Sequence, residues 1–192
     1  GRIQWSPSLG RIYWSETKAD MRWTLETESR IRYIGKDGKG SLRSSGLIHN
    51  PSASGDRIAA VRYEIGGRSV LEIMDGKTGN ILDSFTAPDS LQLVETAWIG
   101  DTVYVTGISE NGYGIYGIAS SGGPWKKILS PQPVMMKDFG SYGDELMFTC
   151  DRTGVNELYH LDPASSELLQ KTSTRYGASD FRYSEDGEWL YY

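Results

Sequence analysis

The sequence predicts an all-β fold built from repeated four-stranded antiparallel sheets. Turn glycines recur at a nearly constant interval, and a short run rich in β-branched and aromatic residues follows each of them. A third run in each repeat alternates apolar and polar residues. No stretch of 10–12 residues keeps a helical period free of turn signals, so we expect almost no helix. A period of 43–45 residues in a chain of 192 indicates β-propeller blades.

The hairpin that opens each repeat is marked by its glycine. The glycines are Gly10, Gly55, Gly100, Gly143 and Gly187, with spacings of 45, 45, 43 and 44 residues. The strand-like runs after them are residues 11–16, 57–64, 102–106, 145–150 and the truncated 189–192. A further short segment precedes each glycine and pairs with the run that follows. Glycine supplies the positive φ that a tight turn of this kind requires.

Two more strands complete each repeat. The third strands are residues 69–75, 113–118 and 156–162, and the fourth are residues 81–85, 125–129 and 168–172. The fourth strands are more polar, as expected for the outer edge of a sheet. Four antiparallel strands per repeat, stacked around an axis, define a propeller. We therefore divide a single propeller segment, 1–192, into blades at 1–45, 46–90, 91–133 and 134–176 and an incomplete fifth at 177–192, about four and a half blades.

Two segments carry a family resemblance. Residues 183–191, YSEDGEWLY, resemble the S-x-D-G-x-x-[IL]-x-[YF] signature of TolB-like propeller repeats. Residues 150–162, CDRTGVNELYHLD, are similar to the S-D-R-x-G-x-x-x-[IL]-Y-x-x-[DN] segment of the same family. The match is good in repeats two, four and five and looser in one and three. The glycine-histidine and tryptophan-aspartate marks of WD repeats are missing.

The resemblance implies a bacterial propeller of six or seven blades, often periplasmic or secreted. Such propellers serve as docking platforms or as the non-catalytic propeller of a larger peptidase. An open arc would leave apolar faces on its two end blades, so we expect a longer parent chain, with other domains of that chain among the possible partners. The first residues lack the apolar run of a signal peptide.

Composition excludes several classes of function. The net charge is −5 and the basic residues are scattered, which argues against nucleic-acid binding. No window reaches the roughly 18 consecutive apolar residues of a membrane helix, so we expect no membrane span. Cys150 is the only cysteine and lies in an apolar run, which predicts a buried thiol.

No catalytic motif is complete. Residues 76–78, GKT, lack the earlier glycine and the helix of a phosphate-binding loop, so a hairpin turn explains them better. His49 and His160 are the only histidines, which excludes a histidine-rich zinc site, and we expect His160 to be a structural imidazole on a strand. No G-x-S-x-G occurs. We therefore expect no enzyme within this segment, no catalytic residue, no metal site and no cofactor.

Acidic residues near strand ends could bind calcium or act as paired carboxylates, but their recurrence at equivalent repeat positions favours a structural role in turns. These residues are Glu16, Glu64, Asp75, Asp151 and Asp162.

The first repeat contains an insertion, residues 17–28, where the other repeats have three or four residues. Insertions in repeat proteins map to loops on one face, often the binding face. Arg and Trp are enriched among residues that dominate protein interfaces, so we predict a binding site at Trp14, Glu16, Arg22 and Trp23. Trp23 could instead fold back onto the neighbouring blade.

Three hypotheses remain open. The first is a non-enzymatic platform that binds a protein, a peptide or a cell-envelope component through loops at one end of the propeller. The second is the non-catalytic propeller of a larger secreted or periplasmic peptidase, where it gates or docks substrate. The third, a carbohydrate-active propeller with axial carboxylates, is less favoured.

Overall fold

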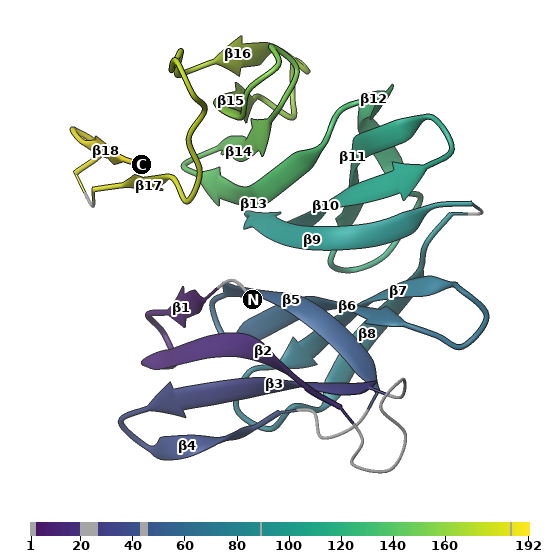
Figure 1. The fold of residues 1–192 in the computed structure, drawn as a ribbon. Helices are drawn as coiled ribbons and strands as arrows, with labels where there is room; N and C mark the ends of the chain where they lie inside the picture. The colour runs from purple at the N-terminus through teal and green to yellow at the C-terminus, as the bar shows by residue number, and fades with distance from the viewer. Residues whose placement is uncertain (1–2, 20–26, 43–45, 89, 185) are drawn as a thin grey trace.

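The chain forms four consecutive antiparallel sheets of four strands, followed by a two-stranded hairpin (Figure 1). The computed structural model describes residues 3–19, 27–42, 46–88, 90–184 and 186–192, and these contain no α-helix. Within each sheet, strands that follow one another in sequence lie side by side, so every sheet is a meander. The predicted all-β propeller of four-stranded antiparallel sheets is confirmed.

The strand bounds follow the predicted repeats closely. The first sheet is β1 (Gln4–Ser6), β2 (Arg11–Ala19), β3 (Thr27–Gly35) and β4 (Gly38–Ser41). The second is β5 (Leu47–Ser54), β6 (Arg57–Tyr63), β7 (Ser69–Asp75) and β8 (Ile81–Thr86). The third is β9 (Gln92–Ile99), β10 (Thr102–Ser109), β11 (Gly112–Ala119) and β12 (Lys126–Gln132). The fourth is β13 (Met136–Tyr142), β14 (Glu145–Cys150), β15 (Glu157–Leu161) and β16 (Leu168–Gln170), and the hairpin is β17 (Arg182–Tyr183) and β18 (Leu190–Tyr191).

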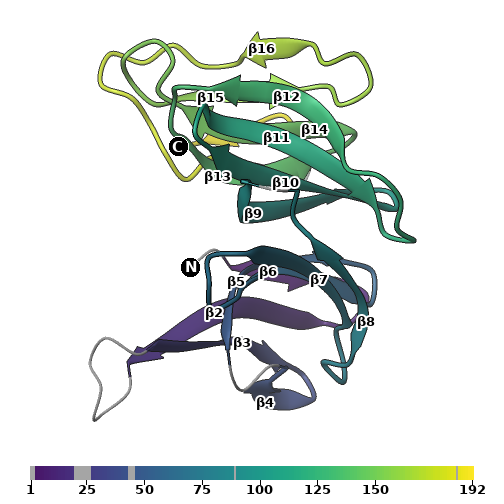
Figure 2. The same cartoon turned by 90° about the vertical axis from the view of Figure 1, so that its right-hand side faces the viewer.

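Successive sheets lie against one another along an arc, and their first strands β1, β5, β9 and β13 surround a common centre (Figures 1 and 2). A cavity of about 90 Å³ at this centre is lined by residues of all four of these strands. Small side chains allow the strands to approach here: Ser52, Ala97 and Gly140 lie in β5, β9 and β13. The Ser52 hydroxyl lies 2.7 Å from that of Thr96, which links the second and third sheets.

The hydrophobic core is divided between the sheet interfaces because successive side chains of a strand point to opposite faces. Ile58 and Ala60 of β6 belong to the cluster shared with the first sheet, whereas Ala59 and Val61 belong to the cluster shared with the third sheet. All four are fully buried. A strand in a middle sheet is therefore apolar on both faces, as its sequence indicates.

All five predicted turn glycines have positive φ. The values are 59° at Gly10, 56° at Gly55, 56° at Gly100, 58° at Gly143 and 75° at Gly187. A side chain at these positions would be strained, which explains why glycine marks each repeat.

The predicted insertion in the first repeat is shorter than expected. The ladder between β2 and β3 continues through the pairs Thr17 with Ser29 and Ala19 with Thr27, so the ends of residues 17–28 are strand. Thr17 and Thr27 are β-branched, which suits the extended ladder. The remaining residues, 20–26, lie outside the described part of the chain.

Candidate functional site

The meander gives the molecule two distinct ends. The glycine turns between first and second strands, and the turns between third and fourth strands, lie at one end, which we call the turn end. The connections between second and third strands, and those from one sheet to the next, lie at the other, which we call the loop end.

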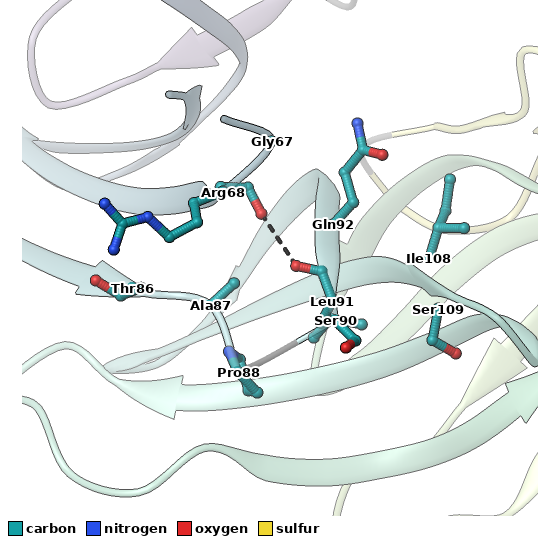
Figure 3. Close-up of a pocket in the computed structure, with 11 residues that line it drawn as sticks. Gly67, Arg68, Thr86, Ala87, Pro88, Ser90, Leu91, Gln92, Ile108 and Ser109 are labelled. Carbon is teal, nitrogen blue, oxygen red and sulfur yellow. Dashed lines mark hydrogen bonds between the residues drawn. The ribbon is translucent and has the colours of Figure 1, made fainter. Parts of the chain in front are cut away.

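A crevice of about 370 Å³ opens at the loop end between the second and third sheets (Figure 3). It is bounded by the turn before β7, the connection from β8 to β9 and the end of β10. The lining residues are Gly67, Arg68, Ser69, Thr86, Ala87, Pro88, Ser90, Leu91, Gln92, Ile108 and Ser109. Both polar and apolar residues line it.

Ser69 holds the walls of this crevice together. Its hydroxyl donates to the Leu91 carbonyl (3.3 Å) and accepts from the Leu93 amide (2.9 Å), and its carbonyl accepts from the Ala87 amide (3.0 Å). Figure 3 draws the bond to Leu91 as a dashed line. Ser69 is itself buried, so these bonds are shielded from water and fix the connection to the second sheet.

The turn that supplies Gly67 and Arg68 to the crevice also carries an exposed apolar side chain. Ile65 is fully exposed at the tip of the turn between β6 and β7. Gly66 and Gly67, with φ of 101° and 87°, make this turn tight. Arg68 follows, largely exposed, with its guanidinium 3.4 Å from the Glu64 carboxylate. An isoleucine between an acid and two glycines was the sequence signal for this exposed turn, and it was missed.

Two of the four predicted site residues lie on a sheet face rather than in a loop. Tyr13 packs toward the second sheet. Side chains alternate between the two faces of a strand, so Trp14 and Glu16 point to the opposite face of the first sheet. The Glu16 carboxylate lies 3.7 Å from both Arg30 and Arg32 on β3. Trp14 and Glu16 therefore share one face with these arginines. Arg22 and Trp23 lie outside the described residues.

The two histidines occupy different environments. His160 is buried on β15; its Nδ1 lies 2.7 Å from the Glu145 carboxylate and its Nε2 lies 3.1 Å from the Tyr183 hydroxyl. The predicted structural imidazole is confirmed. His49 Nε2 lies 3.4 Å from the Ser29 hydroxyl, but that hydroxyl donates to the Ile48 carbonyl at 2.7 Å. Burial lowers the pKa of His49.

Four of the acidic residues near strand ends serve turns and ion pairs. Asp75 accepts bonds from the amides of Lys77 and Thr78, which lower its pKa. Asp162 accepts a hydrogen bond from the Ala164 amide, and Asp151 accepts one from the Met135 amide. Glu64 forms ion pairs with Arg62 and Arg68. The predicted structural role is confirmed for these acids.

The structure also bears on the cysteine, on metal-ligand groups and on membrane helices. Cys150 is buried, as predicted, and burial raises the pKa of its thiol. Within the described ranges, no three His, Cys, Asp or Glu side chains are grouped closely enough to hold a metal ion. Across the same part of the chain, no helix has the length and apolar character to cross a membrane.

The stacked four-stranded meanders define the chain as a β-propeller segment. Its fold is that of TolB-like propellers. TolB from Acinetobacter baumannii superposes with a TM-score of 0.67 at 20% identity, covering 84% of this chain and 42% of that one. A putative TolB from Agrobacterium tumefaciens gives 0.69 at 15% identity, covering 91% and 62%. The chain therefore spans about half the length of these two structures.

Propellers of peptidases are similar as well. A puromycin-hydrolyzing peptidase from Mycobacterium tuberculosis gives a TM-score of 0.65 at 14% identity, covering 91% of this chain and 31% of that one. The propeller domain of the trilobed protease from Pyrococcus furiosus gives 0.57 at 13% identity, covering 96% and 75%. No protein-family model matches the sequence. No curated protein matches it either. At these identities the likeness establishes the fold.

Proposed function

We propose that this segment is a non-enzymatic TolB-like propeller that binds a protein or peptide partner, or a cell-envelope component, through its loop end. The crevice between the second and third sheets, together with Ile65 exposed in the turn that supplies Gly67 and Arg68 to its lining, is the observation that carries the proposal. A fully exposed isoleucine loses water contact only when a partner covers it, and burial of such a side chain contributes about 1.5–3 kcal/mol. The periplasmic or secreted location rests on the family resemblance alone.

Peptide selection tests this function. A library of random dodecapeptides is displayed and selected against the chain, and the affinities of the selected peptides are then measured by fluorescence polarisation. We expect Ile65→Ser to weaken them at least about fivefold, since about 1 kcal/mol of buried apolar contact is lost. Ile81→Ser is the matched control, because Ile81 is also exposed but lies on the outer strand β8. Equal affinities for both variants and the parent chain would place the site elsewhere.

A second candidate is the non-catalytic propeller of a larger peptidase, favoured by the similarity to the puromycin-hydrolyzing peptidase. The sequence of the complete gene separates the two candidates. A hydrolase domain in the same reading frame supports the peptidase, and its absence supports the independent platform.

A further inference from the structure

Arginine side chains join the first three sheets at the turn end. Arg11 begins β2, and its Nη1 donates to the carbonyls of Gly76 (2.9 Å) and Lys77 (3.2 Å) in the turn after β7 of the next sheet. The guanidinium lies 4.1 Å from the ring centre of Tyr33 and pairs with Asp37. One sheet thus provides a guanidinium, and the turn of the next sheet receives it.

The second interface has an arginine in the same position, but the ring and the carboxylate that meet it come from the next sheet and not from its own. Arg57 begins β6; its Nη1 donates to the Ser120 hydroxyl (2.8 Å) and its Nη2 to the Asp101 carboxylate (2.6 Å), both in the third sheet. Its guanidinium lies 4.9 Å from the Trp98 ring. Ser120 is equivalent to Gly76, because each donates its amide to the backbone carbonyl of the aspartate that follows the turn glycine: Ser120 to Asp101, and Gly76 to Asp56.

The third interface lacks the arginine and has a crevice in its place. Thr102 begins β10, in the position that Arg57 has in β6: Thr102 pairs with Ala119 as Arg57 pairs with Asp75. A crevice of about 340 Å³ lies beside Thr102 and extends to Pro163, which is the residue of the fourth sheet equivalent to Gly76 and Ser120. The short, uncharged side chain of Thr102 leaves this volume unfilled.

The lining of the crevice and the turns of the fourth sheet provide groups that would receive a guanidinium. Tyr104 provides an aromatic ring in the lining. Burial raises the pKa of Tyr104, and the negative charge of Asp162 adds to the rise. Asp144, equivalent to Asp101, follows the turn glycine of the fourth sheet and makes no ion pair or side-chain hydrogen bond with any residue in the described ranges. Lys126 also lines the crevice but is exposed on the outer strand β12.

We propose that this crevice binds the guanidinium of an arginine side chain supplied by a partner polypeptide. The two preceding interfaces show how the fold holds a guanidinium at this place: against an aromatic ring, with turn oxygens as acceptors and a carboxylate at its edge. The occupant takes the place of the arginine that the third sheet lacks. The crevice lies at the turn end, so the proposal is independent of the loop-end site.

An NMR titration tests the proposal with N-acetyl-arginine amide as the probe. We expect amide shifts at Thr102, Gly117 and Ala119, and an affinity at least about tenfold above that for N-acetyl-citrulline amide, which has the same shape without the charge. N-acetyl-lysine amide should also bind more weakly, because an ammonium cannot form the planar fork of bonds. Shifts confined to other residues, or equal affinities for arginine and citrulline, would overturn the proposal.

Variants provide a second test. Thr102→Arg should fill the crevice from within, raise the melting temperature and abolish the response to the arginine probe. Thr102→Val, which adds no charge and little volume, should retain the response. Asp144→Asn should weaken binding, and Lys126→Ala should leave it unchanged or strengthen it. A Thr102→Arg protein that folds and still binds the probe at full affinity refutes the assignment, as does loss of binding in Lys126→Ala.

Discussion

Arg11 and Arg57 occupy equivalent positions at two sheet interfaces but differ in burial, and this difference predicts unequal contributions to stability. The Arg11 side chain is 9% exposed and donates to two carbonyls of the next sheet. The Arg57 side chain is 34% exposed and its carboxylate partner, Asp101, is 86% exposed. Water and salt screen the Arg57–Asp101 pair much more than they screen the bonds from Arg11 to the two carbonyls.

The magnitudes follow from these contacts. Arg11→Met keeps most of the apolar stem but removes the two charge-assisted bonds to carbonyls, the pairing with Asp37 and the contact with the Tyr33 ring. The Tyr13 hydroxyl still donates to the Gly76 carbonyl, and we expect a loss of about 2–4 kcal/mol. Arg57→Met should cost about 1 kcal/mol or less, as exposed ion pairs do. Urea unfolding followed by tryptophan fluorescence measures both. If Arg57→Met lowers the free energy of unfolding as much as Arg11→Met does, with the m-value unchanged, burial does not determine the strength of these contacts and the reasoning is wrong.

Three further outcomes are expected. Leu71 is fully buried in the cluster between the second and third sheets, so Leu71→Ala should lower the free energy of unfolding, measured in urea, by about 3 kcal/mol. Leu82 is 51% exposed, so Leu82→Ala should change it by less than about 0.5 kcal/mol. Cys150 should react with a thiol reagent only after unfolding, because its thiol is buried and its pKa raised; rapid native-state labelling would contradict this. The pKa of Asp75 is lowered by the Thr78 amide, so its stabilising effect is present above about pH 4 and is lost as the pH falls further. The deficit of Asp75→Ala measured by thermal unfolding should accordingly be larger at pH 7 than at pH 3, and a pH-independent deficit would disprove the linkage.

Local sequence signals predicted the repeat because they act within a few residues. A glycine such as Gly55 or Gly100 is required by its own backbone conformation, and the alternation in residues 69–75 reflects one strand and its two faces. Both are visible without knowledge of the partners. This is why the strands and their order could be predicted, whereas the end of β2 at Ala19, which depends on pairing with β3, was placed too early.

Contacts between sheets could not be predicted in the same way. The bond from Arg11 to Gly76 joins residues 65 positions apart, and Arg57 to Ser120 spans 63. Nothing near Arg11 in the sequence indicates that a turn carbonyl two hairpins later receives it. The absence of an arginine at Thr102 has meaning only once these contacts are known. Loop-end features such as Ile65 have the same origin, since their exposure depends on the assembled fold.

Nuclear Overhauser contacts test the stacking of the sheets most directly. The Trp98 indole N–H of the third sheet donates to the Ser52 carbonyl of the second at 3.2 Å. The stacked arrangement predicts cross-peaks from this indole proton to Ser52 and Ala53, 46 and 45 residues earlier in the chain. An indole proton with contacts only inside its own sheet, or with cross-peaks to the first sheet instead, would contradict it.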